Sequence, residues 1–157
     1  MAKPRPNSDV IATNRRAHFE YEILETFEAG MALLGPEVKS LREGRANLVD
    51  SYATIRRGEA LLVHLHISPY EKAGRDNPDP RRDRRLLLHR AEIRRLTGKL
   101  AERGFTLVPL RLYWTNGRAK VELGLARGKR RHDKRETIKR RESERELSRA
   151  IRARNRG

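Results

Sequence analysis

The sequence predicts a mainly β fold with some α-helix: a small closed antiparallel barrel with flanking helices and a basic C-terminal tail. Two observations predict the barrel, namely short stretches in which apolar and polar residues alternate, and the turns or long connections between them. A third predicts the tail, since charged residues replace apolar ones after residue 127. We therefore expect a disordered leader over residues 1–12, a barrel over 13–127 and the tail over 128–157.

The first predicted elements follow the leader, whose prolines and polar residues favour disorder and include no apolar signal-peptide segment. Residues 19–23 alternate as in a half-buried strand, and a second, more buried strand segment is expected around Met31. The stretch GPEVKSLREG predicts a short helix, with Gly35 as its N-cap and Gly44 just beyond its end.

The middle of the barrel is predicted from residues 50–104. The stretch DSYATIRRGEALLVHLHI predicts two strands joined by a tight turn at Arg57-Gly58, and a polar, proline-rich loop follows. A helix comes next, whose buried stripe consists of Ile93, Leu96 and Leu100.

A hairpin over residues 105–127 is the last predicted barrel element, and Asn116-Gly117 is its turn signal. Its first strand is expected to carry three residues on one face, Leu110, Leu112 and Trp114. Pro109 implies an edge or a bulge, because proline has no N–H to donate. Short strands with inserted helices favour a barrel of the oligonucleotide-binding type.

The chain carries 37 Lys and Arg against 21 Asp and Glu, a formal net charge of +16. Such an excess favours a polyanionic partner, with nucleic acid first and an anionic membrane second. No stretch approaches the roughly 18 apolar residues of a membrane-spanning helix. The sequence has no cysteine, which excludes disulfides and thiolate metal sites. We expect a soluble, cytoplasmic, monomeric protein that binds no membrane.

Catalytic and metal-binding motifs are weak or missing. His64 and His66 would lie on one side of a predicted strand, but two imidazoles without a nearby third ligand do not define a metal site. The sequence has no nucleophile elbow, zinc-protease motif or phosphate-binding loop. We expect no metal, no cofactor and no enzymatic activity; a small ribonuclease built from His, Lys and Glu is one alternative.

Three basic clusters, at residues 14–16, 39–45 and 81–90, favour an extended surface that follows RNA phosphates. To this surface we assign Asn14, Arg15, Arg16, Lys39 and Arg42. Lys39 could instead pair with Glu43. Aromatic residues make up only 5% of the chain, so recognition of RNA shape and backbone is favoured over base stacking. A ribosomal protein lodged permanently in ribosomal RNA is a second alternative.

Two long segments resemble signature regions of the SmpB family, the bacterial SsrA-binding proteins (small protein B): NRRAHFEYEILETFEAGMALLGPEVKSLREGRANLVDSYA and LYWTNGRAKVELGLARGKRRHDKRETIKRR. The resemblance implies an oligonucleotide-binding-type barrel that binds the tRNA-like domain of tmRNA (SsrA RNA) in trans-translation. The implied partners are tmRNA, the stalled 70S ribosome and alanyl-tmRNA bound to elongation factor Tu.

The resemblance also implies RNA-binding roles for Glu28, Leu87 and Lys120. Glu28 would accept hydrogen bonds from base amino groups or a ribose 2′-hydroxyl, or orient a neighbouring arginine. Its alternative is a turn carboxylate bonded by backbone N–H groups. Leu87 would otherwise be a core residue, and Lys120 an ordinary exposed lysine.

In the family the tail lies in the decoding centre of 16S ribosomal RNA and in the empty mRNA channel. Gly128 would be the hinge, His132 would stack on a nucleobase, and the other matched tail residues are Lys129, Arg130, Arg131, Asp133, Lys134 and Arg135. Residues 128–157 carry 13 Lys and Arg and few apolar side chains. We therefore expect this tail to be disordered when free and helical on the ribosome.

Overall fold

Strand β9 (Arg118–Gly128) pairs with a neighbour on each of its edges, and this double pairing closes the sheet. Its two long antiparallel partners are β2 (Tyr21–Met31) and β8 (Phe105–Thr115). The structure is a computed structural model that describes residues 9–129, 141–143 and 145–152.

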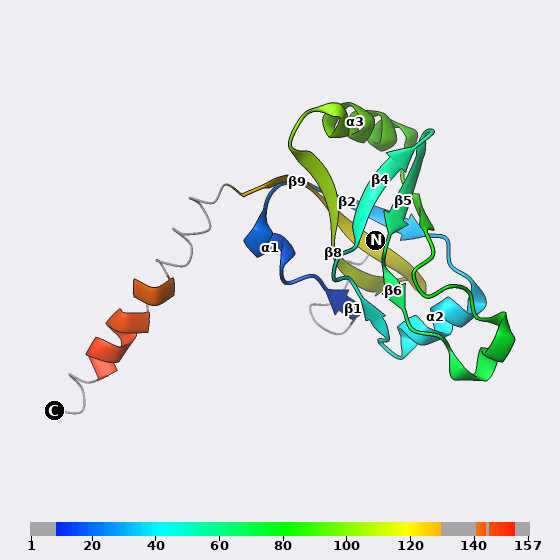
Figure 1. Ribbon diagram of the computed structural model, residues 1–157, viewed down its shortest axis with the longest axis horizontal. Coiled ribbons are helices and arrows are strands. Elements are labelled where there is room, and N and C mark those ends of the chain that lie inside the picture. The colour runs from blue at the N-terminus through cyan, green and yellow to red at the C-terminus, as the bar shows by residue number, and fades with distance from the viewer. Residues whose placement is uncertain (1–8, 130–140, 144, 153–157) are drawn as a thin grey trace.

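Three further strands complete a ring-like antiparallel sheet in the described part of the chain (Figure 1). From β8 the order runs through β4 (Tyr52–Arg56), β5 (Glu59–Val63) and β7 (Arg84–Leu87) back to β2. Outside the ring, β1 (Val10–Thr13) pairs with the C-terminal half of β8, and β3 (Ala46–Asn47) pairs with β6 (His66–Ile67). The predicted mainly β, closed antiparallel fold is confirmed.

Helices cover the ends of the ring (Figure 1). Helix α3 (Arg90–Ala101) lies beside β4 and β8 at one end, and α2 (Gly35–Arg42) lies beside β6 at the other. Each contributes a fully buried leucine, Leu96 from α3 and Leu41 from α2. A single turn, α1 (Ala17–Glu20), precedes β2, and a 3₁₀ segment, η1 (Glu71–Asp76), lies in the predicted polar loop.

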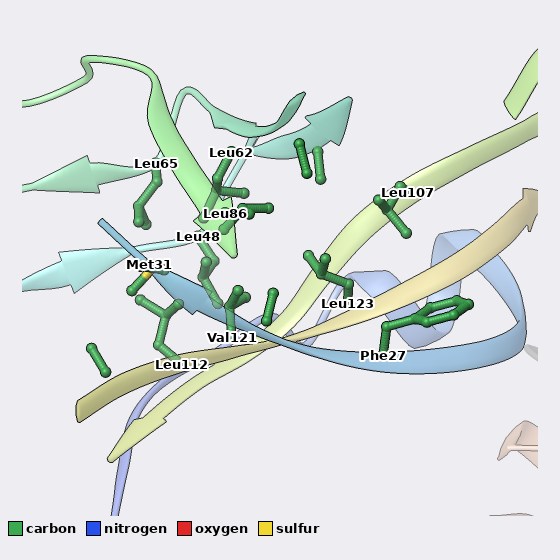
Figure 2. Close-up of a cluster of buried hydrophobic side chains, with 14 of the residues drawn as sticks. Phe27, Met31, Leu48, Leu62, Leu65, Leu86, Leu107, Leu112, Val121 and Leu123 are labelled. Atoms are coloured by element: carbon green, nitrogen blue, oxygen red, sulfur yellow. The ribbon is translucent and has the colours of Figure 1, made fainter. Parts of the chain in front are cut away.

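The interior of the ring is filled by apolar side chains from every strand around it (Figure 2). The labelled residues of this core are Phe27, Met31, Leu48, Leu62, Leu65, Leu86, Leu107, Leu112, Val121 and Leu123. Each is at most 9% exposed. Burial of this apolar surface is the main force that holds the ring together.

Both predicted tight turns are present. Asn116 and Gly117 have φ angles of 50° and 74°, and Arg57 and Gly58 have φ angles of 51° and 76°. Two successive left-handed residues suit a two-residue turn between twisted antiparallel strands. Pro109 lies at a β-bulge, as predicted, because the pairing of β8 with β9 shifts between Pro109 and Arg111.

The same bulge corrects the predicted face of β8. Leu110 was expected beside Leu112 and Trp114, but it packs into a smaller cluster with Ala17 and Val108, whereas Leu112 lies in the main core. An extra residue in one strand reverses the faces of the residues that follow, so simple alternation fails across it.

The N-terminal boundaries also differ from the prediction. Strand β1 begins at Val10, inside the predicted leader, because Ile11 and Ala12 pack against the core and the strand pairs with β8. The strand expected from Phe19 begins at Tyr21, after the turn of α1.

Two further positions differ. The N-cap of α2 is Leu34 rather than Gly35, one residue earlier than predicted. His64 lies beyond the end of β5 with a φ of 63°, so His64 and His66 do not share one continuous strand.

A buried ion pair ties α2 to β7. Glu37 is 2% exposed and Arg84 is fully buried. Arg84 Nε donates to Glu37 Oε2 at 2.8 Å, and the Arg84 guanidinium also donates to the carbonyls of Leu65 and Pro80. Burial alone would raise the pKa of Glu37, but hydrogen bonds from Arg82, the Leu34 N–H and Arg84 lower it below its ordinary value.

The Glu37→Gln variant should lower the free energy of unfolding by about 3–5 kcal/mol, because it leaves the Arg84 charge buried without its counter-charge. Urea unfolding followed by circular dichroism measures this. The matched control is Glu59→Gln, which breaks the exposed Glu59–Arg85 pair and should change stability by less than about 1 kcal/mol. Equal effects of the two variants would contradict a special role for the buried pair.

Candidate nucleic-acid interface

Four cross-strand neighbours form one row on the outside of the ring. Tyr113 of β8 lies opposite Lys120 of β9, Lys120 lies opposite Gly30 of β2, and Gly30 lies opposite Leu87 of β7. Cross-strand neighbours point to the same face of a sheet. The ring therefore brings residues of β2 and β7 beside the β8–β9 hairpin, which lies far from both in the sequence.

A hollow of about 640 Å³ is lined by two residues of this row, Leu87 and Lys120. Its lining residues are Glu28, Leu87, Leu88, His89, Glu92, Thr115, Asn116, Arg118 and Lys120. We call it the Lys120 hollow. Glu28, Leu87 and Lys120, the three residues that the family resemblance singled out, all line it. Leu87 is 55% exposed, so it is not the core residue that the alternative interpretation required.

Gly30 lets the Leu87 and Lys120 side chains lie close to the backbone in the middle of the row. A methyl group added there would lie 3.4 Å from Leu87 Cβ and 3.7 Å from Lys120 Nζ, which are ordinary contact distances. Alanine would therefore fit, but any longer side chain would compete with Leu87 and Lys120 for space. The Lys120 side chain thus lies within reach of an apolar surface that Leu87 leaves exposed to solvent.

Glu28 lies in the middle of β2 and is held by a tyrosine. The Tyr113 hydroxyl donates to Glu28 Oε2 at 2.5 Å. Neither expected local environment is present, since Glu28 is not in a turn and no ion pair joins it to an arginine among the described residues. Its cross-strand neighbour is a second carboxylate, Glu122, which pairs with Arg111 at 3.4 Å.

Tyr113 is 2% exposed, and the Arg111 guanidinium lies 4.4 Å from the centre of its ring. Burial raises the pKa of Tyr113, and the hydrogen bond to Glu28 and the charge of that carboxylate raise it further. Tyr113 therefore stays protonated at neutral pH, and its hydroxyl remains a donor.

Arg118 is a lining residue that the sequence analysis missed. It is exposed, and it lies two residues before Lys120 on the same face of β9. The period of two in a strand could have placed it beside Lys120. No comparable signal links Tyr113 to Glu28, because the two residues are 85 positions apart.

The other predicted RNA-binding residues lie outside the Lys120 hollow. Asn14 has a structural bond, since its Nδ2 donates to the Pro109 carbonyl at 2.9 Å. Asn14 and the exposed Arg16 line a second hollow of about 420 Å³, next to the exposed Arg15. On α2, Arg42 is exposed and Lys39 Nζ lies 5.5 Å from the centre of the Tyr70 ring.

Some arginines of the predicted basic surface are not available at the surface. Within the cluster 81–90, Arg84 is fully buried and Arg82 also binds Glu37, so both guanidinium groups are used inside the protein. Glu43, the predicted partner of Lys39, pairs instead with Arg45 at 3.8 Å. Arg81, Arg85 and Arg90 remain exposed.

The predicted tail boundary at residue 128 is too early. Gly128 is the last paired residue of β9, opposite Tyr21, and the Lys129 N–H donates to the Glu20 carbonyl at 3.0 Å. The predicted ribosome-binding residues Arg130, Arg131, His132, Asp133, Lys134 and Arg135 lie outside the described residues. Farther along, residues 141–143 and 145–152 are helical with exposed side chains.

Within the ranges that the structure describes, no three His, Asp or Glu side chains are grouped closely enough to hold a metal ion. His64 instead lies with its ring centre 5.8 Å from that of Tyr52. Over the same ranges, none of the helices has the length and apolar character that crossing a membrane demands.

Comparison with known proteins identifies the family. The SmpB protein family model matches residues 11–153. The chain belongs to the SmpB family. An SsrA-binding protein of Geobacillus kaustophilus is 56% identical over 151 residues, which cover 96% of this chain and 97% of that protein. One from Syntrophobacter fumaroxidans is 58% identical over 153 residues, 95% of each chain.

A solved structure is similar to this member of the SmpB family as well. It is described as "tmRNA-SmpB: a journey to the center of the bacterial ribosome". Its SmpB-like chain matches with a TM-score of 0.65 and 55% sequence identity, over 81% of this chain and 93% of that chain.

Two adjacent leucines of β7 have different environments, since Leu87 lines the hollow and Leu86 lies in the core. Leu87→Ala should change the free energy of unfolding by about 0.5 kcal/mol or less, because Leu87 is 55% exposed. Its neighbour Leu86 is 2% exposed, so Leu86→Ala should cost about 2–5 kcal/mol. Thermal and urea unfolding of both variants would test this, and a large loss for Leu87→Ala would return that residue to the core.

Proposed function

We propose that this chain is a non-enzymatic adaptor of trans-translation, which binds tmRNA (SsrA RNA) and accompanies it to stalled ribosomes in the bacterial cytoplasm. The observation that carries the proposal is the match to the SmpB family over residues 11–153. Relatives named SsrA-binding proteins share more than half of their residues with it over nearly the whole chain. The partners of the proposed complex are tmRNA, the 70S ribosome and elongation factor Tu with alanyl-tmRNA.

The Lys120 hollow is the proposed contact with the tRNA-like domain of tmRNA. Lys120 and Arg118 supply positive charge for phosphates, Leu87 supplies an exposed apolar contact, and Glu28 accepts hydrogen bonds. Positive charge alone would hold any RNA, because phosphate contacts carry no sequence information. A carboxylate among the cations favours RNA that presents a donor group at the matching position.

The basic segment after Lys129 is the proposed ribosome contact, in the decoding centre and the empty mRNA channel. In residues 141–152, four arginines gather on one side of the helical segment: Arg141, Arg145, Arg149 and Arg152. Such a face suits a groove walled by ribosomal RNA, whose phosphates would compete with a bound mRNA for the same space.

The Lys120→Ala variant should bind the tRNA-like domain more weakly and with a flatter salt dependence. Loss of one phosphate contact should reduce the log–log slope by roughly 0.7–0.9. Fluorescence anisotropy at several salt concentrations measures both quantities. Lys72→Ala is the matched control, because it removes the same charge from an exposed position in η1, outside the hollow. An unchanged slope for Lys120→Ala would remove Lys120 from the interface.

Truncation after Lys129 should separate the two proposed contacts. The cut leaves the pairing of Gly128 and the Lys129–Glu20 bond in place, so the ring should fold and keep its affinity for tmRNA. Peptide tagging in a reconstituted translation system should be abolished. The full chain should restore it, and a large loss of RNA affinity after truncation would contradict this division of roles.

Co-purification from cells, followed by sequencing of the bound RNA, tests the proposed function as a whole. Enrichment of tmRNA over bulk tRNA is the expected result. Equal recovery of all RNAs would indicate nonspecific binding driven by the charge of the chain. Cleavage products of folded RNA, if they appeared on incubation with the pure protein, would contradict a purely binding role.

A further inference from the structure

We propose that Tyr113 is a positioning residue for RNA binding: its buried hydroxyl holds the Glu28 carboxylate so that Oε1 faces RNA in the Lys120 hollow. The inference deepens the proposed function and rests on it. The RNA group recognised there is a hydrogen-bond donor, which is a base amino or imino group or a ribose 2′-hydroxyl.

The geometry makes Tyr113 a fixed donor. Its ring is buried on β8 between two cross-strand neighbours, Val10 of β1 and Lys120 of β9, and Arg111 lies 4.4 Å from the ring centre. The hydroxyl lies 2.5 Å from Glu28 Oε2. An exposed glutamate otherwise loses conformational entropy when it binds a ligand, and a bond from a rigid donor reduces that loss.

Charge distinguishes Glu28 from its neighbour. Glu28 and Glu122 are directly opposite each other, and like charges in that arrangement are destabilising. Arg111 binds Glu122 at 3.4 Å and compensates its charge. Glu28 receives its bond from a neutral hydroxyl instead, so its orientation is fixed while its negative charge is kept.

One carboxylate oxygen remains for a ligand. Within the described residues, the Tyr113 hydroxyl is the one group that bonds the Glu28 carboxylate, and it occupies Oε2. Glu28 lines the hollow next to Lys120 and Arg118. A phosphate would be attracted by the two cations and repelled by Glu28, whereas an RNA donor group can bond Oε1 directly. Tyr113 therefore contributes to selectivity without touching the RNA.

A double-mutant cycle in the full chain tests the proposal, with the variants Tyr113→Phe, Glu28→Ala and the two combined. The probe is the tRNA-like domain of tmRNA, with bulk tRNA as competitor. Tyr113→Phe should weaken binding about tenfold, the value of one hydrogen bond to a charged group. In the Glu28→Ala background it should change binding less than twofold, because no carboxylate is left to orient.

Two measurements separate positioning from a structural effect. The salt dependence of binding should be the same for Tyr113→Phe and the unaltered chain, since no phosphate contact is removed. The melting temperature reports the fold, and Thr97→Val, which removes an exposed hydroxyl from α3 outside both hollows, is the control that should bind like the unaltered chain.

Three results would overturn the inference: unchanged affinity of Tyr113→Phe, an equal loss with and without Glu28, or a Tyr113→Phe chain that no longer folds. In the last case the hydroxyl would hold the sheet rather than the carboxylate. Failure of the proposed function is distinguishable, because the unaltered chain would then show no preference for the tRNA-like domain over bulk tRNA.

Discussion

The pairing of β9 along both edges is the constraint on which the rest of the structure depends. It makes neighbours of β2, β8 and β9, and through β7 it completes the row that carries Tyr113, Lys120, Gly30 and Leu87. Without the β8–β9 pairing that closes the ring, Tyr113 would lie far across an open sheet from the other three residues. The same closure encloses the aliphatic core, so stability and the geometry of the hollow come from one set of hydrogen bonds and one buried surface.

Some basic residues of this chain stabilise the fold, and others line the candidate interface. Arg84 of β7 bonds Glu37 of α2 and the carbonyls of Leu65 and Pro80, which lie in the loops before β6 and β7. It is therefore unavailable to a ligand. Lys120 and Arg118 line an open hollow and make no ion pair among the described residues. A net charge of +16 therefore overstates the charge that can meet RNA, and burial decides which cations contribute.

Sequence reasoning succeeded where the signal is local. Alternation and the Asn116-Gly117 turn predicted the β8–β9 hairpin, and helical spacing around Leu96 predicted α3. It failed where the decisive partner is distant or the local pattern is interrupted. The four residues of β1 lie in a polar context and depend on β8, and the bulge after Pro109 sends Leu110 to the opposite face.

The candidate site also depends on partners that are distant in the sequence. Glu28, Leu87 and Lys120 came from a family resemblance, since no periodicity marks an exposed glutamate, leucine or lysine as a ligand. That they line one hollow is a property of the closed ring. The bond from Tyr113 to Glu28 spans 85 positions, and Arg84 resembled any other residue of a basic run until its carboxylate partner was visible.

Strand β9 also connects the hollow to the end of the described sheet at Gly128. It runs from Lys120 in the hollow to Gly128, paired with β2 along this whole length and with β8 as far as Arg127, with one register shift on each side. Eight residues of extended chain span about 27 Å at most. The strand thus sets the distance between the proposed RNA contact and the point at which the chain leaves the sheet, so the position of the one determines the position of the other.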